Sequence, residues 1–172
     1  VYLSYLLKPN CPVENIPEIT AWVSVAAARA IETLCPVDVG IKWVNDIVIN
    51  GKKVGGILSE MSVEAETGAV KYVITGIGVN VCQTGFPEDI RDIAGSLYTQ
   101  AGAHISRCDV AAKLVCELDR LSVDFPQERD KYLEYYRTHC VTLGKDVVFL
   151  NSGEKKTAFA ESIDRDFSML DR

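Results

Sequence analysis

The apolar positions of the chain follow two different periods, and their order predicts a mixture of strands and helices. Runs at residues 47–50, 54–63 and 70–81 are rich in β-branched residues and predict strands. Asn50-Gly51 separates the first two and is among the strongest short-range hairpin signals, because both positions tolerate positive φ. A turn at residues 66–68 separates the second from the third. The pattern predicts an antiparallel meander over residues 54–81 and another strand at residues 1–7.

Two longer segments have the spacing of amphipathic helices. In residues 17–34 apolar side chains recur at helical spacing, Pro17 suits the first helical position, and Cys35-Pro36 ends the helix. A second helix begins after Ser106, which has Asp109 three residues on as in an N-terminal capping arrangement, and it ends before Pro126. We expect a third helix at residues 128–138 and a short helical turn at residues 88–93.

From residue 141 the apolar period returns to that of a strand. Residues 146–150 and 157–163 predict a hairpin around a turn at residues 151–153, and residues 167–170 begin another strand. Such a hairpin cannot bury a core alone, so we expect residues 141–172 to be a small β domain without its end. Residues 1–140 are expected to be the main domain of a longer protein, N-terminally incomplete because the chain begins inside a strand. The fold class expected is α+β, with a mixed, largely antiparallel sheet and packed helices.

Polar and glycine residues interrupt the predicted strands at a few positions. Lys42 lies between Ile41 and Trp43, so strand alternation places it on the opposite face from both. The other interruptions are Asn45, Asp46, Gly55, Gly56, Gly76, Gly78 and Asn80. Glycine inside a strand often marks a place where a ligand or another backbone approaches closely. The pattern therefore favours a small-molecule floor on the sheet.

Structural explanations compete with that interpretation. Gly55-Gly56 also fits a β-bulge, and Lys42 also fits an edge-strand lysine that opposes aggregation. Gly76 and Gly78 do not form a dinucleotide fingerprint, because no third glycine follows and no helix begins there.

Composition excludes several classes of function. The formal net charge of −6 argues against nonspecific nucleic-acid binding, which needs Lys and Arg to neutralise phosphates. No apolar run approaches the roughly 20 residues needed to cross a bilayer. The six cysteines form no Cys-x-x-Cys pair and the two histidines have no metal-ligand partner at helical spacing, which argues against a zinc site. Most cysteines have apolar neighbours and suit reduced core positions of a cytosolic protein.

Three linked motifs resemble those of biotin protein ligases, the biotin–[acetyl-CoA-carboxylase] ligases. They are Lys42-Trp43-Val44-Asn45-Asp46, Lys53-Val54-Gly55-Gly56-Ile57-Leu58-x-Glu60 and Gly76-Ile77-Gly78-Val79-Asn80. The resemblance covers essentially the whole chain. It implies a catalytic domain of the class II aminoacyl-tRNA synthetase/biotin ligase-like fold over residues 1–140, followed by an SH3-like C-terminal domain over residues 141–172.

The same resemblance implies a two-step ligase reaction. Biotin is activated by ATP to biotinyl-5′-AMP, with Mg²⁺ bound beside the nucleotide, and is then transferred to a lysine of a biotin carboxyl carrier domain of a carboxylase. It implies catalysis by Lys42, whose ammonium would offset the repulsion between carboxylate and phosphate. The residues implied for biotin are Lys42, Gly55, Gly56 and Ile57. Those implied for the nucleotide are Asn45, Asp46, Gly78 and Asn80, with Asp46 also a Mg²⁺ ligand. A homodimer, a cytoplasmic location, and no membrane or nucleic-acid partner for this segment are also expected.

The chain departs from the family pattern in two respects. The family motif usually has proline where this chain has Val44. The family's glycine- and arginine-rich loop, which closes over biotin and the adenylate, has no counterpart in this sequence. We therefore expect these 172 residues alone to bind biotin weakly and to label an acceptor inefficiently.

Two other functions are left open by the sequence. A lipoate ligase-like acyltransferase would share the fold and a catalytic lysine. A non-catalytic dimerisation or regulatory module would keep the sheet without the chemistry.

Overall fold

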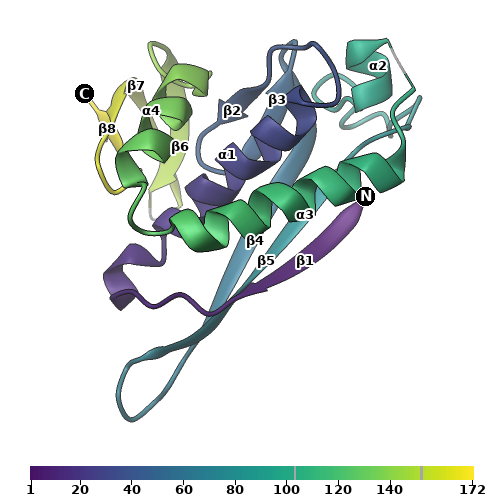
Figure 1. Cartoon of the computed structure of the whole chain (residues 1–172). Helices are drawn as coiled ribbons and strands as arrows, with labels where there is room; N and C mark the ends of the chain where they lie inside the picture. Colours follow the sequence, from purple (N-terminus) through teal and green to yellow (C-terminus); the bar gives the residue numbers. More distant parts are fainter. Residues whose placement is uncertain (103, 152) are drawn as a thin grey trace.

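The computed structural model describes residues 1–102, 104–151 and 153–172, and they form a mixed α+β fold (Figure 1). A five-stranded antiparallel sheet has the order β1-β5-β4-β3-β2, and a three-stranded sheet has the order β6-β7-β8. The elements are β1 (Tyr2–Leu7), η1 (Val13–Asn15), α1 (Glu18–Glu32), β2 (Gly40–Lys42), β3 (Asp46–Ile49), β4 (Lys52–Val63), β5 (Val70–Val79), α2 (Leu97–Ala101), α3 (Arg107–Asp124), α4 (Arg129–His139), β6 (Asp146–Asn151), β7 (Glu154–Ile163) and β8 (Met169–Asp171). The expected α+β class with a largely antiparallel sheet is confirmed.

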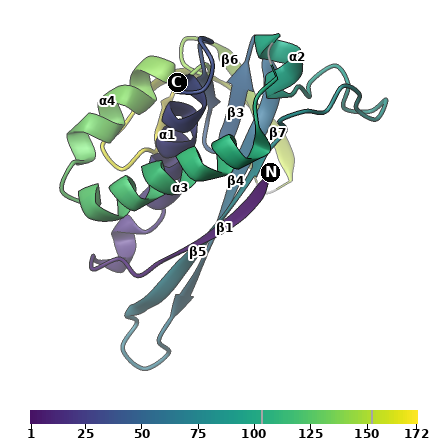
Figure 2. The same ribbon diagram turned by 45° about the vertical axis from the view of Figure 1, so that its right-hand side comes forward.

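The predicted hairpins form where the turn residues require them. Asn50 and Gly51 have φ of 51° and 75°, the positive values that join two strands through a two-residue turn, and they connect β3 to β4. Gly68, at φ 70°, lies in the turn between β4 and β5. Figures 1 and 2 both show this end of the β4–β5 hairpin projecting beyond the helices.

Helices cover one face of the five-stranded sheet. Both views place α1 and α3 on the same side of it (Figure 2). α1 is buried around most of its circumference, because β4, α3 and α4 all pack against it. On the opposite face Tyr2, Leu6 and Leu58 are exposed, and they alternate along their strands with residues that face the helices. This open face is where the sheet can accept a ligand.

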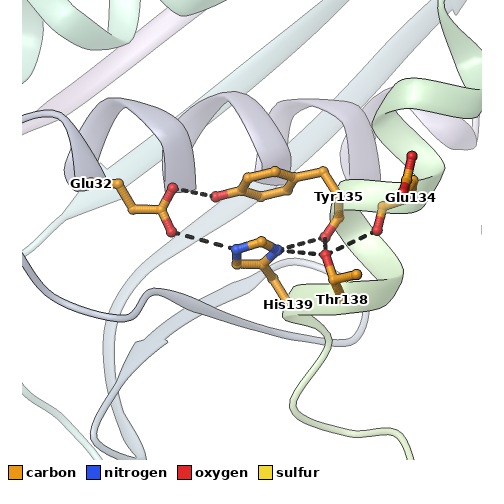
Figure 3. A network of polar contacts seen from close by, with 5 residues as sticks. All are labelled: Glu32, Glu134, Tyr135, Thr138 and His139. Atoms are coloured by element: carbon orange, nitrogen blue, oxygen red, sulfur yellow. Dashed lines mark hydrogen bonds and ion pairs between the residues drawn. The ribbon is translucent and has the colours of Figure 1, made fainter.

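A polar network fastens α4 to α1 (Figure 3). The Tyr135 hydroxyl donates a 2.7 Å hydrogen bond to Glu32 Oε2, and His139 Nε2 lies 3.6 Å from Glu32 Oε1. The Tyr135 and His139 rings stack with centroids 3.8 Å apart, and the Arg29 guanidinium lies 4.7 Å from the Tyr135 ring. The network fixes the end of α4 beside β2, where the Val141 amide donates to the Ile41 carbonyl.

The three-stranded sheet shares the core of the larger one. Ile163 and Phe167 are buried in the main hydrophobic cluster, and the Phe167 ring meets that of Tyr136 edge-on at 5.5 Å. The Arg137 Nε of α4 donates a 2.8 Å hydrogen bond to the Ile163 carbonyl. The division into residues 1–140 and 141–172, and the SH3-like nature of the second part, stay predictions.

Residues 88–93 form hydrogen-bonded turns of the expected helical kind, since the Arg91 amide donates to the Pro87 carbonyl and the Ala94 amide to the Ile90 carbonyl, but they do not form a helix. The helix in this region is instead α2, which begins after Ser96, whose side chain accepts from the Thr99 amide in a capping box. α2 also explains why β5 ends at Val79 and not at residue 81. The Asn80 and Val81 carbonyls accept hydrogen bonds from Leu97 and Tyr98 in its first turn.

The other boundaries predicted from the sequence lie close to the observed ones. The Ser106 side chain caps α3 as expected and accepts from the Cys108 and Asp109 amides. The last strand begins at Met169 and not at residue 167, because Phe167 has a φ of 63° that a strand cannot include. The predicted turn at residues 151–153 includes residue 152, which lies outside the described residues.

Candidate functional site

A cavity of about 420 Å³ lies on the open face, over the middle of the sheet. Its walls come from β1, β5 and β4 and from the turn that leads into β3. The lining residues are Tyr2, Leu3, Ser4, Asn45, Asp46, Lys53, Gly56, Ile57, Leu58, Gly76, Ile77 and Gly78. Asp46 and Lys53 are the charged members of this lining.

The strand register explains why these side chains meet. One row of paired residues crosses the whole sheet, from Tyr2 through Gly78, Gly56 and Asp46 to Lys42. Directly paired residues in antiparallel strands point to the same face, so all five lie on one side. The two glycines leave the centre of the row open, with the 91% exposed Tyr2 on one side and Asp46 on the other.

A β-bulge brings Lys53 to this face. Strict alternation along β4 would place Lys53 on the same side as Gly55 and opposite Gly56. The pairing with β3 shifts register here, because Ile47 pairs with Gly55 while its neighbour Val48 pairs with Lys53. The extra residue, Val54, resets the alternation, as bulges do when they redirect a side chain.

The redirected lysine forms an ion pair with Asp46. Lys53 Nζ lies 2.5 Å from Asp46 Oδ1, with 49% of the lysine side chain and 23% of the aspartate side chain exposed. The backbone of Lys53 is fixed by hydrogen bonds to Ile93 and Gly95. The backbone at Gly56 and Gly78 forms the glycine floor of the cavity. One cationic and one anionic group are held against each other at the edge of this floor.

Asn45 fixes the turn that carries Asp46. Its side-chain amide donates a 2.7 Å hydrogen bond to the Ile57 carbonyl, and the Ile57 amide donates back to the Asn45 carbonyl. The two bonds continue the β3–β4 pairing beyond Asp46. The carboxylate is thus held between two fixed stretches of backbone.

Five of the predicted site residues come together at the cavity, namely Asn45, Asp46, Gly56, Ile57 and Gly78. Gly55 points to the buried side, where an added Cβ would lie 2.8 Å from the Gly78 carbonyl oxygen. Asn80 lies just past β5, and its side-chain amide donates a 3.0 Å hydrogen bond to the Gly95 carbonyl. Neither residue belongs to the lining.

Lys42 lies at the wall of a neighbouring cavity of about 480 Å³. This second cavity, between β2 and the three-stranded sheet, is also lined by Trp43, Phe149 and Met169. The Trp43 indole is held there by a 3.1 Å hydrogen bond from its Nε1 to the Phe167 carbonyl. Lys42 thus lies on the same face as Gly56 and Gly78, at the end of the paired row beyond Asp46, but does not line the first cavity.

Sequence reasoning missed Lys53 and Tyr2 as site residues. Lys53 stands in the second motif, two residues before Gly55, but alternation assigns it to the wrong face. The available signal was the adjacent Gly55-Gly56 pair, which fits a bulge next to it. Tyr2 could have been found only through its pairing with Gly78.

Metal-ligating side chains are not clustered in the part of the chain that the structure describes. No group of three or more His, Cys, Asp or Glu side chains is placed there to hold a metal ion. Across residues 1–102, 104–151 and 153–172, no helix is both long and apolar enough to cross a membrane.

Comparisons with known proteins point to one group of enzymes. Residues 1–80 match the model of the Biotin/lipoate A/B protein ligase family. The chain is 40% identical over 127 residues to the bifunctional ligase/repressor BirA of Bacillus subtilis, covering 73% of this chain and 38% of that protein. It is 29% identical over 168 residues to the biotin--[acetyl-CoA-carboxylase] ligase of Mycobacterium tuberculosis, covering 92% of this chain and 60% of that protein.

The fold is similar to that of a solved structure, the biotin protein ligase from Aquifex aeolicus in complex with biotin and ATP. The two share a TM-score of 0.84 and 26% identity over 99% of this chain and 70% of that one. The chain spans less than two thirds of the length of the Bacillus and Mycobacterium relatives.

Proposed function

We propose, from the premise that this chain belongs to the biotin protein ligase family, that the whole protein activates biotin with ATP and attaches it to a carrier protein. In the first step the biotin carboxylate attacks the α-phosphorus, forming biotinyl-5′-AMP and releasing pyrophosphate. In the second step a lysine amine of a biotin carboxyl carrier domain attacks the acyl carbon, and AMP leaves. The similarity to an Aquifex aeolicus enzyme in complex with biotin and ATP supports both substrates.

The observation that carries the proposal is the Lys53 ammonium at the edge of a glycine floor. A carboxylate and a phosphate repel each other, and a fixed cation between them offsets that repulsion. It also stabilises the charge that develops in the transition state, a contribution that is often the largest in catalysis. The geometry thus supports Lys53 as the cation of the first step.

We propose that biotin lies against β4 at Gly56 and Ile57. With no side chain at Gly56 or Gly78, a flat ring system can approach the backbone of two adjacent strands. Gly55 would act indirectly, because the absence of its side chain lets β4 approach the Gly78 carbonyl. Aromatic and aliphatic neighbours, Tyr2 and Leu58, provide apolar surface beside this floor.

We propose that Asn45 and Gly78, which line the cavity, contact the nucleotide. Asn80 would act indirectly, because its side-chain amide holds the segment that ends at Gly95. Mg²⁺ commonly reaches such sites on the phosphates and keeps only one or two protein carboxylates as ligands. Asp46 is the carboxylate of this lining, but its Oδ1 already contacts the Lys53 ammonium. This donor set does not fit a resident Mg²⁺ site.

Further parts of the proposal rest mainly on the family resemblance. We propose that Lys42, at the neighbouring cavity, is the second candidate for the catalytic cation. The three-stranded sheet would belong to an SH3-like domain, and the resemblance alone supports a homodimer. The expectation that most cysteines occupy core positions is wrong, since only Cys35 and Cys140 of the six are buried, and Cys108 and Cys116 are exposed. Free thiols at these two exposed positions suit the reducing conditions of the cytoplasm.

Biotin-dependent exchange between ATP and pyrophosphate, measured with the whole protein, tests the proposal. We expect exchange with biotin, and none when lipoate replaces it. Lys53→Ala should lower the rate about 10²–10³-fold, as loss of a preorganised electrostatic group does. Lys42→Ala is the matched variant. If Lys42→Ala shows the large loss of rate instead, the catalytic cation is Lys42. Absence of exchange in the wild type would favour a non-catalytic module.

A further inference from the structure

We propose that Asp46 is a positioning residue, whose carboxylate holds the Lys53 ammonium over the bare backbone of Gly56. The reaction it would serve rests on the proposed function. The positioning itself rests on the geometry of three residues that come from two strands.

The three residues meet at one point of the floor. Lys53 Nζ and Asp46 Oδ1 lie 2.5 Å apart and form a charge-assisted contact. A Cβ added to Gly56 would lie 3.3 Å from Lys53 Cε, 3.4 Å from Lys53 Nζ and 3.5 Å from Asp46 Oδ1. The ion pair therefore lies beside the position that a Cβ at residue 56 would take, and it borders the open backbone of Gly56 without covering it.

Lys53 needs such a partner because its side chain is about half exposed. A lysine ammonium on a flexible four-carbon stem can take up many positions, so it is not preorganised by its own structure. Asp46 is better fixed, since its backbone pairs with Lys42 on one side and Gly56 on the other. Contact with this short, fixed carboxylate turns a mobile cation into one of defined position.

The contact with Lys53 also argues against a role of Asp46 as a metal ligand. A divalent cation bound at Asp46 would lie beside the Lys53 ammonium and be repelled by it, and repulsion between adjacent cations is strong in a partly desolvated site. With the carboxylate neutralised by Lys53, the local charge is balanced before any nucleotide binds. The geometry thus assigns Asp46 to Lys53.

Pyrophosphate exchange by the whole protein tests the assignment through Asp46→Asn and Gly56→Ala, each alone and combined with Lys53→Ala. Asp46→Asn should lower kcat about 10²-fold, as a misplacement of about 1 Å can. The Mg²⁺ concentration for half-maximal rate should not change. In the Lys53→Ala background Asp46→Asn should have no further effect, because it acts only through Lys53. Glu88→Gln, which removes the charge of the exposed partner of Arg91, is the matched control and should leave the rate unchanged.

A further loss of rate on top of Lys53→Ala, or a raised Mg²⁺ requirement in Asp46→Asn, would overturn the proposal. Crystal structures of the wild type and the two single variants give a second readout. In Asp46→Asn we expect the Lys53 ammonium to leave its place beside residue 56, whereas in Gly56→Ala it should shift by only a few tenths of an ångström to make room for the methyl group. An unmoved ammonium in Asp46→Asn would also overturn the proposal. The crystal structures test the position of Lys53 even if the wild type catalyses no exchange. Absence of exchange would reject only the proposed function.

Discussion

Gly55 and Gly56 are adjacent but face opposite sides of the sheet, so the lack of a side chain has a different consequence at each. At Gly55 a Cβ would meet the Gly78 carbonyl at 2.8 Å, a contact that requires the two strands to separate. At Gly56 it would meet the end of the Lys53 side chain and the Asp46 carboxylate. The absence of a side chain thus allows close packing of β4 and β5 at Gly55 and leaves the cavity open at Gly56.

Glu18 and Arg129 form a partly buried ion pair away from the cavity. Glu18 is 3% exposed, and its Oε1 lies 2.8 Å from Arg129 Nη2. Burial raises the pKa of the Glu18 carboxyl, although the nearby Arg129 lowers it. A raised folded-state pKa means that the stabilising contribution of Glu18 is full below its ordinary pKa of about 4.3 and is lost as pH rises through the folded value.

We therefore expect Glu18→Gln to show a weaker pH dependence of stability than the wild type. The difference in unfolding free energy, wild type minus variant, should decrease with pH over the range above about pH 4.3, the ordinary pKa of a glutamate. Chemical denaturation of both proteins across this range measures it. An increase with pH would mean that Arg129 outweighs burial and that the pKa is lowered.

The sequence predicted individual site residues where a motif carried them, and failed where a local irregularity decided the face. Asn45, Asp46, Gly56, Ile57 and Gly78 were all expected at the site and all line the cavity. Lys53 was missed because one bulge residue, which sequence periodicity does not locate, reverses its direction.

At the scale of elements, the β3–β4–β5 meander was predictable because local turn chemistry determines it. Asn50 and Gly51 both adopt the positive φ angles that a two-residue hairpin turn requires. The end of β5 and the position of α2 were not predictable, since the Asn80 and Val81 carbonyls are taken by amides of Leu97 and Tyr98. These long-range hydrogen bonds leave no trace in local periodicity.

Gly55→Ala should test how tightly β4 and β5 approach each other. The new methyl group would overlap the Gly78 carbonyl, so we expect a loss of about 1–3 kcal/mol in unfolding free energy, the usual cost of overpacking. Gly76→Ala is the matched control. Its Cβ would lie 3.6 Å from the Leu58 carbonyl, an ordinary contact, and should cost less than about 0.5 kcal/mol. Equal losses in urea denaturation would contradict this account of Gly55.

At the scale of the whole molecule, the two sheets share one core. Phe167, from the connection between β7 and β8, is 3% exposed and lies near the Tyr136 and Trp22 rings. Trp22 in turn stacks on Tyr132 with centroids 4.0 Å apart. The sequence located the small β unit but could not predict this shared core, because no local pattern indicates which buried face packs on which.

The shared core predicts that both sheets unfold together. Phe167→Ala should lower the unfolding free energy by about 3–5 kcal/mol, as truncation of a buried phenylalanine does. Tryptophan fluorescence, which reports on Trp22 and Trp43, and far-ultraviolet circular dichroism should give coincident transitions in the wild type. Two separate transitions would show that the three-stranded sheet is an independent unit.

The central claim is that the glycine floor of the open face receives biotin, and a biotin titration followed by backbone amide NMR on isotope-labelled protein tests it most directly. We predict the largest and saturable shifts at Gly56, Ile57 and Gly78, since these amides lie at the cavity between β4 and β5. Shifts centred instead on Trp43 and Phe149 of the neighbouring cavity, with Gly56 and Gly78 unmoved, would contradict the account.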